Sequence, residues 1–190
     1  MAVKTFTAGS VLTASDTNTY LANAGLDYVK GATLATAATH DIESAFSSTY
    51  TNYLLVLSQI TTSQASIGVR IRMKTASTVY DGTGHKQMIY GITSGGGTAN
   101  VTSATETFIY TTDSGVTTTN SHGVVMEILQ PNLANPTICT TRTAFQWTDA
   151  WYMRHGATVV DTTTQYTGFR IYTTAGTVAI TYALYGFRLP

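Results

Sequence analysis

The chain has 190 residues, of which 11% are charged, and its ten Lys and Arg are balanced by ten Asp and Glu. The zero net charge argues against a nucleic-acid partner. The chain has a single cysteine, Cys139, which excludes an internal disulfide framework. No apolar stretch is long enough to insert into a membrane. Average soluble domains contain about 25% charged residues. A free monomer with so little charge is poorly protected against self-association, so we expect partner subunits to cover much of its surface.

A short helix is predicted near the N-terminus. Thr13 can serve as its N-cap, Asp16 as an acidic group in its first turn, and Gly25 as its stop. A helix of this length is marginal in isolation, so it must dock on another surface. Residues 1–7 lack the apolar core of a secretory signal, which predicts synthesis in a cytoplasm. We divide the chain into an N-terminal anchor segment, residues 1–30, and a β domain, residues 31–190.

Two strands are predicted early in the β domain. Residues 53–60 form a continuous apolar run, typical of a core strand covered on both faces. Residues 67–75 alternate between apolar and charged side chains. The alternation predicts a buried face and a solvated stripe that contains Arg70, Arg72 and Lys74.

The remaining strand signals continue to the C-terminus. They cover residues 86–93, 103–111, 123–129, 137–147, 151–160, 168–173 and 177–187. The short turn at residues 174–176 predicts that the last two strands form a hairpin. Strands at regular spacing with no helix among them predict an all-β fold, an antiparallel β-sandwich of jelly-roll-like form.

Enzymatic motifs are missing from the sequence. It contains no nucleophile elbow, no phosphate-binding loop and no pair of residues at zinc-ligand spacing. A carboxylate pair for glycoside cleavage stays open, because such pairs form in space and not in sequence. The histidines are far apart and adjoin predicted turns or strand ends; they are His40, His85, His122 and His155. We expect no catalytic residue, no cofactor and no metal.

Aromatic residues gather around one predicted turn. The chain has 12 Tyr and 2 Trp, and the turn brings together Trp147, Asp149, Trp151 and Tyr152. Aromatic faces beside polar groups can stack on sugar rings and bind their hydroxyls. The same side chains are also common in cores and subunit interfaces. The sequence leaves both interpretations open: a carbohydrate site, or a core or interface contact.

The N-terminal segment carries a pattern of matching residues, namely Phe6, Gly9, Val11, Leu12, Thr13, Ala14, Asp16, Asn18, Tyr20 and Leu21. In this pattern the segment resembles the opening of many phage tail-fibre and minor tail proteins. The resemblance covers about the first tenth of the chain. It implies a virion subunit that attaches to the particle through this segment and displays its β domain, usually as a homotrimer. The assembly contacts that it implies are Phe6, Val11, Leu12, Asp16, Tyr20 and Leu21.

Two functions are therefore expected from the sequence. The first is a tail-associated or fibre-type subunit whose displayed β-sandwich binds the host surface, for example its polysaccharide. The alternative is a capsid decoration (cement) protein that stabilises the phage head, which the small size and the lack of a shaft favour. An enzyme such as a depolymerase ranks third, for want of catalytic motifs. In either of the first two cases the protein is located in the virion and its partners are its own copies and other virion proteins.

Overall fold

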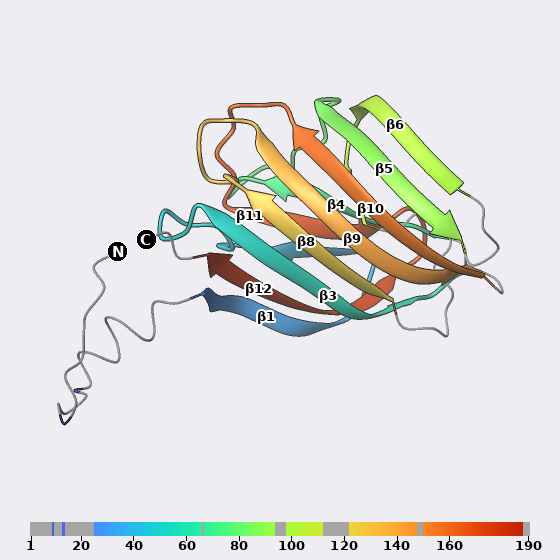
Figure 1. The fold of residues 1–190 in the computed structure, drawn as a ribbon, viewed down its shortest axis with the longest axis horizontal. Coiled ribbons are helices and arrows are strands. Elements are labelled where there is room, and N and C mark those ends of the chain that lie inside the picture. The colour runs from blue at the N-terminus through green and yellow to red at the C-terminus, as the bar shows by residue number, and fades with distance from the viewer. Residues whose placement is uncertain are drawn as a thin grey trace.

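The computed structural model describes residues 25–65, 67–93, 98–111, 122–147 and 150–187, together with Gly9 and Thr13 (Figure 1). These residues form strands and contain no helix. The strands are β1 (Leu26–Ala37), β2 (Thr39–Ile42), β3 (Asn52–Thr62), β4 (Val69–Lys74), β5 (His85–Thr93), β6 (Thr98–Glu106), β7 (Ile109–Tyr110), β8 (Gly123–Leu129), β9 (Thr137–Trp147), β10 (Ala150–Val160), β11 (Gly168–Thr173) and β12 (Val178–Phe187). No helix in this part of the chain has the length and apolarity needed to cross a membrane.

The strands form two antiparallel sheets. The large sheet has eight strands in the order β1-β12-β3-β8-β9-β10-β5-β6, and the small sheet has four in the order β2-β11-β4-β7. In Figure 1 β4 and β11 pass behind the large sheet, so the viewer looks onto its outer face. The edges of the large sheet are β1, in blue, and β6, in green. The predicted all-β antiparallel fold is confirmed.

Apolar side chains from both sheets meet in the core. On β3, Tyr53, Leu55 and Leu57 are fully buried, and they share the core with Ile71 of β4 and Phe169 of β11. The residues between them on β3 are only partly buried. Residues 53–60 therefore form a core strand with one fully buried face, and the prediction that both faces are covered is wrong.

A β-bulge interrupts β3 near its end. Gln59 has a positive φ of 50°, and the register with β12 shifts between Ala179 and Thr181. Before the bulge the buried residues of β3 have odd numbers. The extra residue shifts this alternation by one position, so that Ile60 and Thr62 are buried after the bulge. The core face of this long strand is thereby maintained over its whole length.

The interior becomes polar under β5, β9 and β10. Buried threonines replace the aliphatic side chains there; they are Thr137, Thr141, Thr143 and Thr158. Gln87 of β5 connects the layers, because its Oε1 accepts hydrogen bonds from the Thr158 hydroxyl and from the backbone N–H of Tyr110, each at 3.1 Å. A buried polar group is tolerated when it is hydrogen-bonded in this way.

The alternation on β4 is confirmed, but its polar face is not a solvated stripe. The guanidinium carbon of Arg70 lies 3.6 Å from the centroid of the Phe108 ring, and that of Arg72 lies 4.8 Å from the Tyr172 ring. Lys74 is only 4% exposed and forms ion pairs with Asp41 and Glu43. Aromatic and acidic side chains from neighbouring segments cover these cations, which the pattern of one strand cannot indicate.

The predicted hairpin at the C-terminal end is wrong. β11 belongs to the small sheet, where it pairs with β2 and β4, whereas β12 pairs with β1 and β3 in the large sheet. The turn at residues 174–176 is therefore a crossing between layers. β1 begins at Leu26, within the segment 1–30 that the sequence assigned to the anchor, and the predicted N-terminal helix lies outside the described residues.

Candidate binding surface

A strip of exposed apolar side chains lies on the outer face of the large sheet. The apolar strip consists of Met88, Tyr90 and Ile92 of β5 and Trp151 and Met153 of β10. Each of these side chains is between 50% and 62% exposed. β5 and β10 are paired, and Ile92 lies directly opposite Met153. Contiguous apolar surface of this kind marks a contact site more often than a solvated face.

The local sequence explains why the strip forms. β5 alternates, so that His85, Gln87 and Ile89 point into the interior while the residues between them point outward. The outward positions include Met88, Tyr90 and Ile92, so the larger apolar side chains of β5 lie on its exposed face, whereas His85 and Gln87 occupy inward positions. The missed signal was the run from Met88 to Ile92, which is apolar on both faces of the predicted strand.

Two shallow hollows flank the ring of Tyr90. One has a volume of about 290 Å³ and lies over Thr140, His155 and Ala157. The other, of about 300 Å³, lies between Tyr90, Ile92, Met153 and His155. The lining of the first includes Gly156 and Ala157 and that of the second includes Gly91, so protruding side chains alternate with depressions along the strip.

The charges around the strip are neutralised within the chain. Lys86 of β5 pairs with Asp161, which follows β10, and Arg142 of β9 pairs with Glu127 of β8 at 3.4 Å. Exposed pairs of this kind add little stability. Their effect is that the two ion pairs described here add no net charge to this surface.

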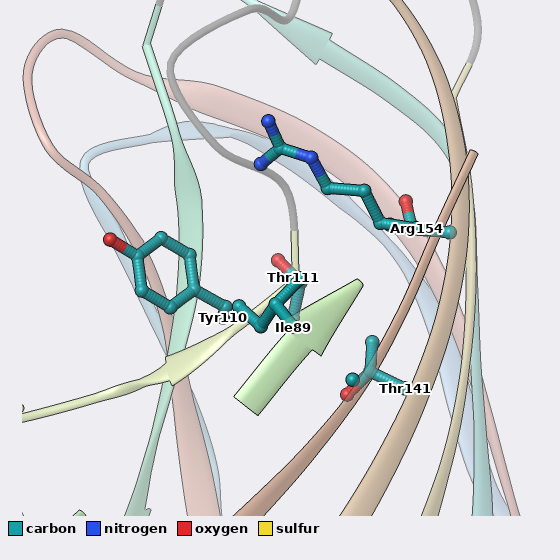
Figure 2. A pocket seen from close by; sticks show the side chains of 7 residues that line it. Ile89, Tyr110, Thr111, Thr141 and Arg154 are labelled. Atoms are coloured by element: carbon teal, nitrogen blue, oxygen red, sulfur yellow. The ribbon is translucent and has the colours of Figure 1, made fainter. Parts of the chain in front are cut away.

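A separate pocket lies between the sheets, where Ile89, Tyr110, Thr111, Thr141 and Arg154 converge (Figure 2). Its volume of about 10 Å³ is at the lower limit for a single water molecule. Figure 2 shows the Arg154 side chain extending from its strand into this interior, and its guanidinium carbon lies 5.1 Å from the centroid of the Phe145 ring. The space is a small packing defect in the polar half of the core.

The predicted aromatic cluster is divided by the pleat of β10. Trp151 is 50% exposed on the outer face, whereas Tyr152 points inward and stacks on Phe145 with ring centroids 5.3 Å apart. The side chain of Trp147 and the whole of Asp149 lie outside the described residues. Of the four predicted contact residues, the structure therefore places one on the apolar strip and one in the interior.

The predicted anchor residues cannot be placed. Phe6, Val11, Leu12, Asp16, Tyr20 and Leu21 lie outside the described residues.

The histidines do not come together. His40 is hydrogen-bonded to the carbonyl oxygen of Val178 at 2.9 Å, His122 is buried beside Phe145, and His155 lies in the outer hollows. His85 is fully buried, and its burial lowers the pKa of the ring. Within the described residues, no group of three or more His, Cys, Asp and Glu side chains is arranged to hold a metal ion.

Comparison with known proteins gives no relative. The chain matches no protein-family model, no curated protein and no solved structure.

Proposed function

We propose that the chain is a structural subunit of a phage virion, of the tail-associated or fibre type, with a non-enzymatic role. The observation that carries the proposal is the apolar strip, because it gives a nearly uncharged domain a surface suited to being covered. The resemblance of the N-terminal segment to phage tail proteins supplies the kind of assembly. Within this proposal, residues 1–24 attach the subunit to the particle, and the jelly-roll-like form and the N-terminal helix stay expectations.

A protein partner fits the strip better than a sugar does. Protein interfaces are enriched in aromatic side chains and methionine, and the strip contains both. A sugar site would need polar groups beside its aromatic rings. Among the described residues, Gln146 and Met153 are the neighbours of Trp151 on the outer face, and of these only Gln146 can bind a hydroxyl. We therefore place assembly contacts on the strip and leave host binding to other surfaces of the displayed domain.

Capsid decoration is the second candidate, since the same apolar strip on a chain of this size could also contact a phage head. Immunogold labelling separates the two. Antibodies against the β domain should label the tails of intact particles in electron micrographs. Labelling of heads would assign the chain to decoration, and particles that carry no label at all would overturn the virion proposal.

Host contact is tested with the purified protein. It is incubated with host cells and with cells from which the surface polysaccharide has been removed. The fibre-type proposal expects binding to the first and loss of binding to the second. If the protein ignores both but binds empty heads and raises their heat stability, the decoration function is correct.

A further inference from the structure

We infer that the apolar strip is a contact between two copies of this chain, packed sheet on sheet across a twofold axis. A patch that meets the same patch on another copy forms an isologous contact, which a twofold axis generates. Sheets pack face to face at about 10 Å, with side chains of the two faces interdigitating. The outer face of β5 and β10 offers a surface of this kind to a second copy.

The strip supplies more than half of the area that a dimer needs. Each of its side chains is about half exposed, which leaves roughly 100 Å² of accessible surface per residue and about 500 Å² for the strip. A specific interface buries about 800 Å² on each partner. Neighbouring outer-face residues of β9, among them Thr140 and Ala144, are small enough to be covered along with it. The remaining area can therefore come from the strand next to the strip.

The charge of the face permits a copy to approach. On the outer face of β5, β8, β9 and β10, the described ionic side chains are paired within one chain, Lys86 with Asp161 and Arg142 with Glu127. Opposing like charges would weaken a contact between identical surfaces. Because each of these two cations has its own carboxylate, the described ion pairs of two copies bring no net charge into the contact.

The relief of the strip is also self-complementary. The ring of Tyr90 is 62% exposed and stands between the hollows of about 290 and 300 Å³. In a twofold arrangement the Tyr90 ring of each copy can enter a hollow of the other. The hollow over Ala157 is walled by Met88 and His155, so the entering ring would contact both apolar and polar atoms.

Light scattering of the purified full chain tests the inference. A single chain has a mass of 20.3 kDa, and we expect twice this mass, falling toward the monomer on dilution. The double variant Tyr90→Ser with Met153→Ser should weaken dimerisation at least tenfold. Its matched control is Tyr28→Ser on β1, at the opposite edge of the sheet, where the tyrosine is 63% exposed. The control should keep the mass of the unaltered protein.

A single charged variant guards against a folding defect in the double variant. Met88→Lys changes a side chain that is 58% exposed and places two cations near each other across the twofold axis. It should lower the mass while the circular dichroism spectrum stays unchanged, and added salt should partly restore the dimer. A monomer at every concentration, a trimer, or strip variants that keep the mass of the unaltered protein would overturn the inference.

The inferred dimer depends on the proposed function only in one respect, namely that the dimer is part of a virion. It differs from the homotrimer that the N-terminal resemblance implies, and the mass in solution decides between them. Because light scattering needs no particle, a dimer combined with unlabelled particles would refute only the virion proposal. A monomer combined with labelled tails would refute only the twofold contact.

Discussion

The imidazole of His85, the first residue of β5, is buried beside the turn that precedes the strand. Its Nδ1 is 3.2 Å from the carbonyl oxygen of Gly82 and 3.1 Å from that of Glu106, so this nitrogen carries the proton and donates. The ring packs beside Tyr80, with centroids 5.3 Å apart. Burial, with a smaller contribution from the positive charge of Arg72, lowers the pKa of His85 despite these two hydrogen bonds.

The lowered pKa predicts a loss of stability in mild acid. In the unfolded chain His85 titrates near pH 6.5, so below that pH the unfolded state binds a proton that the folded state resists. The free energy of unfolding should therefore fall as the pH drops below about 6.5, by at most about 1.4 kcal/mol per pH unit for this group. Urea denaturation at pH 7.5 and 5.5 measures the difference.

The variant His85→Gln is the control, because its amide can still donate a hydrogen bond but does not titrate. Its free energy of unfolding should change less between the two pH values than that of the unaltered protein. Asp41 does not affect this comparison. Its hydrogen bonds to Arg170 lower its pKa, so its contribution to the pH dependence of the free energy of unfolding falls in a more acidic range. Equal pH dependence in the two proteins would contradict the assignment to His85.

The sequence predicts which side chains of a strand point inward more reliably than it predicts which residues those side chains contact. The buried positions of β4, Val69, Ile71 and Met73, follow its pattern. The same rule divides Trp151 from Tyr152, although their closeness in sequence suggested a shared site. Contacts such as that of Arg70 with Phe108 join segments far apart in the chain, and no local pattern predicts them.

Two glycines show how closely the elements pack. At Gly168 on β11, an added Cβ atom would lie 2.2 Å from the carbonyl oxygen of Ile42 on β2. At Gly123, at the start of β8, an added Cβ would meet no atom within 4 Å. Neither glycine has a positive φ, so the two positions differ in space and not in backbone conformation.

Substitution of these glycines therefore tests the pairing of β11 with β2. Gly168→Ala forces backbone to move away from backbone, and we expect it to lower the free energy of unfolding by about 1–3 kcal/mol. Gly123→Ala should be neutral or stabilise by up to about 1 kcal/mol, because alanine restricts the unfolded chain. Thermal unfolding of both variants measures the difference, and equal midpoints would mean that the two strands are not packed as described.

The elements with strong local patterns were predicted, and those defined by distant pairing were not. β8 and β9 have the bounds expected from their sequences, whereas β1 was missed. β1 contains Lys30 and Gly31 and owes its conformation to pairing with β12, the other end of the chain. The predicted strand at residues 103–111 is divided after Glu106, because the chain leaves the large sheet there and enters the small one as β7.

At the scale of the whole molecule, the low fraction of charged residues and the exposed apolar strip both favour a surface that a partner covers. The low charge of the chain predicted that partner subunits cover part of its surface, but composition cannot locate that part. The apolar strip arises because β5 and β10 lie together near one edge of an eight-stranded sheet. Such adjacency depends on strand order, which local sequence patterns leave open.

Removal of residues 1–24 tests the separation of anchor and β domain. β1 begins at Leu26, so the deletion removes none of the described strands. The shortened protein should unfold with the same midpoint as the full chain and should no longer join particles, which co-sedimentation with particles measures. Loss of cooperative unfolding would contradict an anchor that is separate from the domain.

A longer deletion provides the contrast. Removing residues 1–37 also deletes β1, whose Val29 and Leu34 are partly buried against the core, and leaves the edge of β12 unpaired. Full burial of one such side chain contributes about 1.5–3 kcal/mol, so we expect a loss of roughly 2–4 kcal/mol from these two partly buried residues. An unpaired edge should also promote aggregation. If both deletions left stability unchanged, β1 would be no part of the domain, and the boundary would lie beyond residue 37.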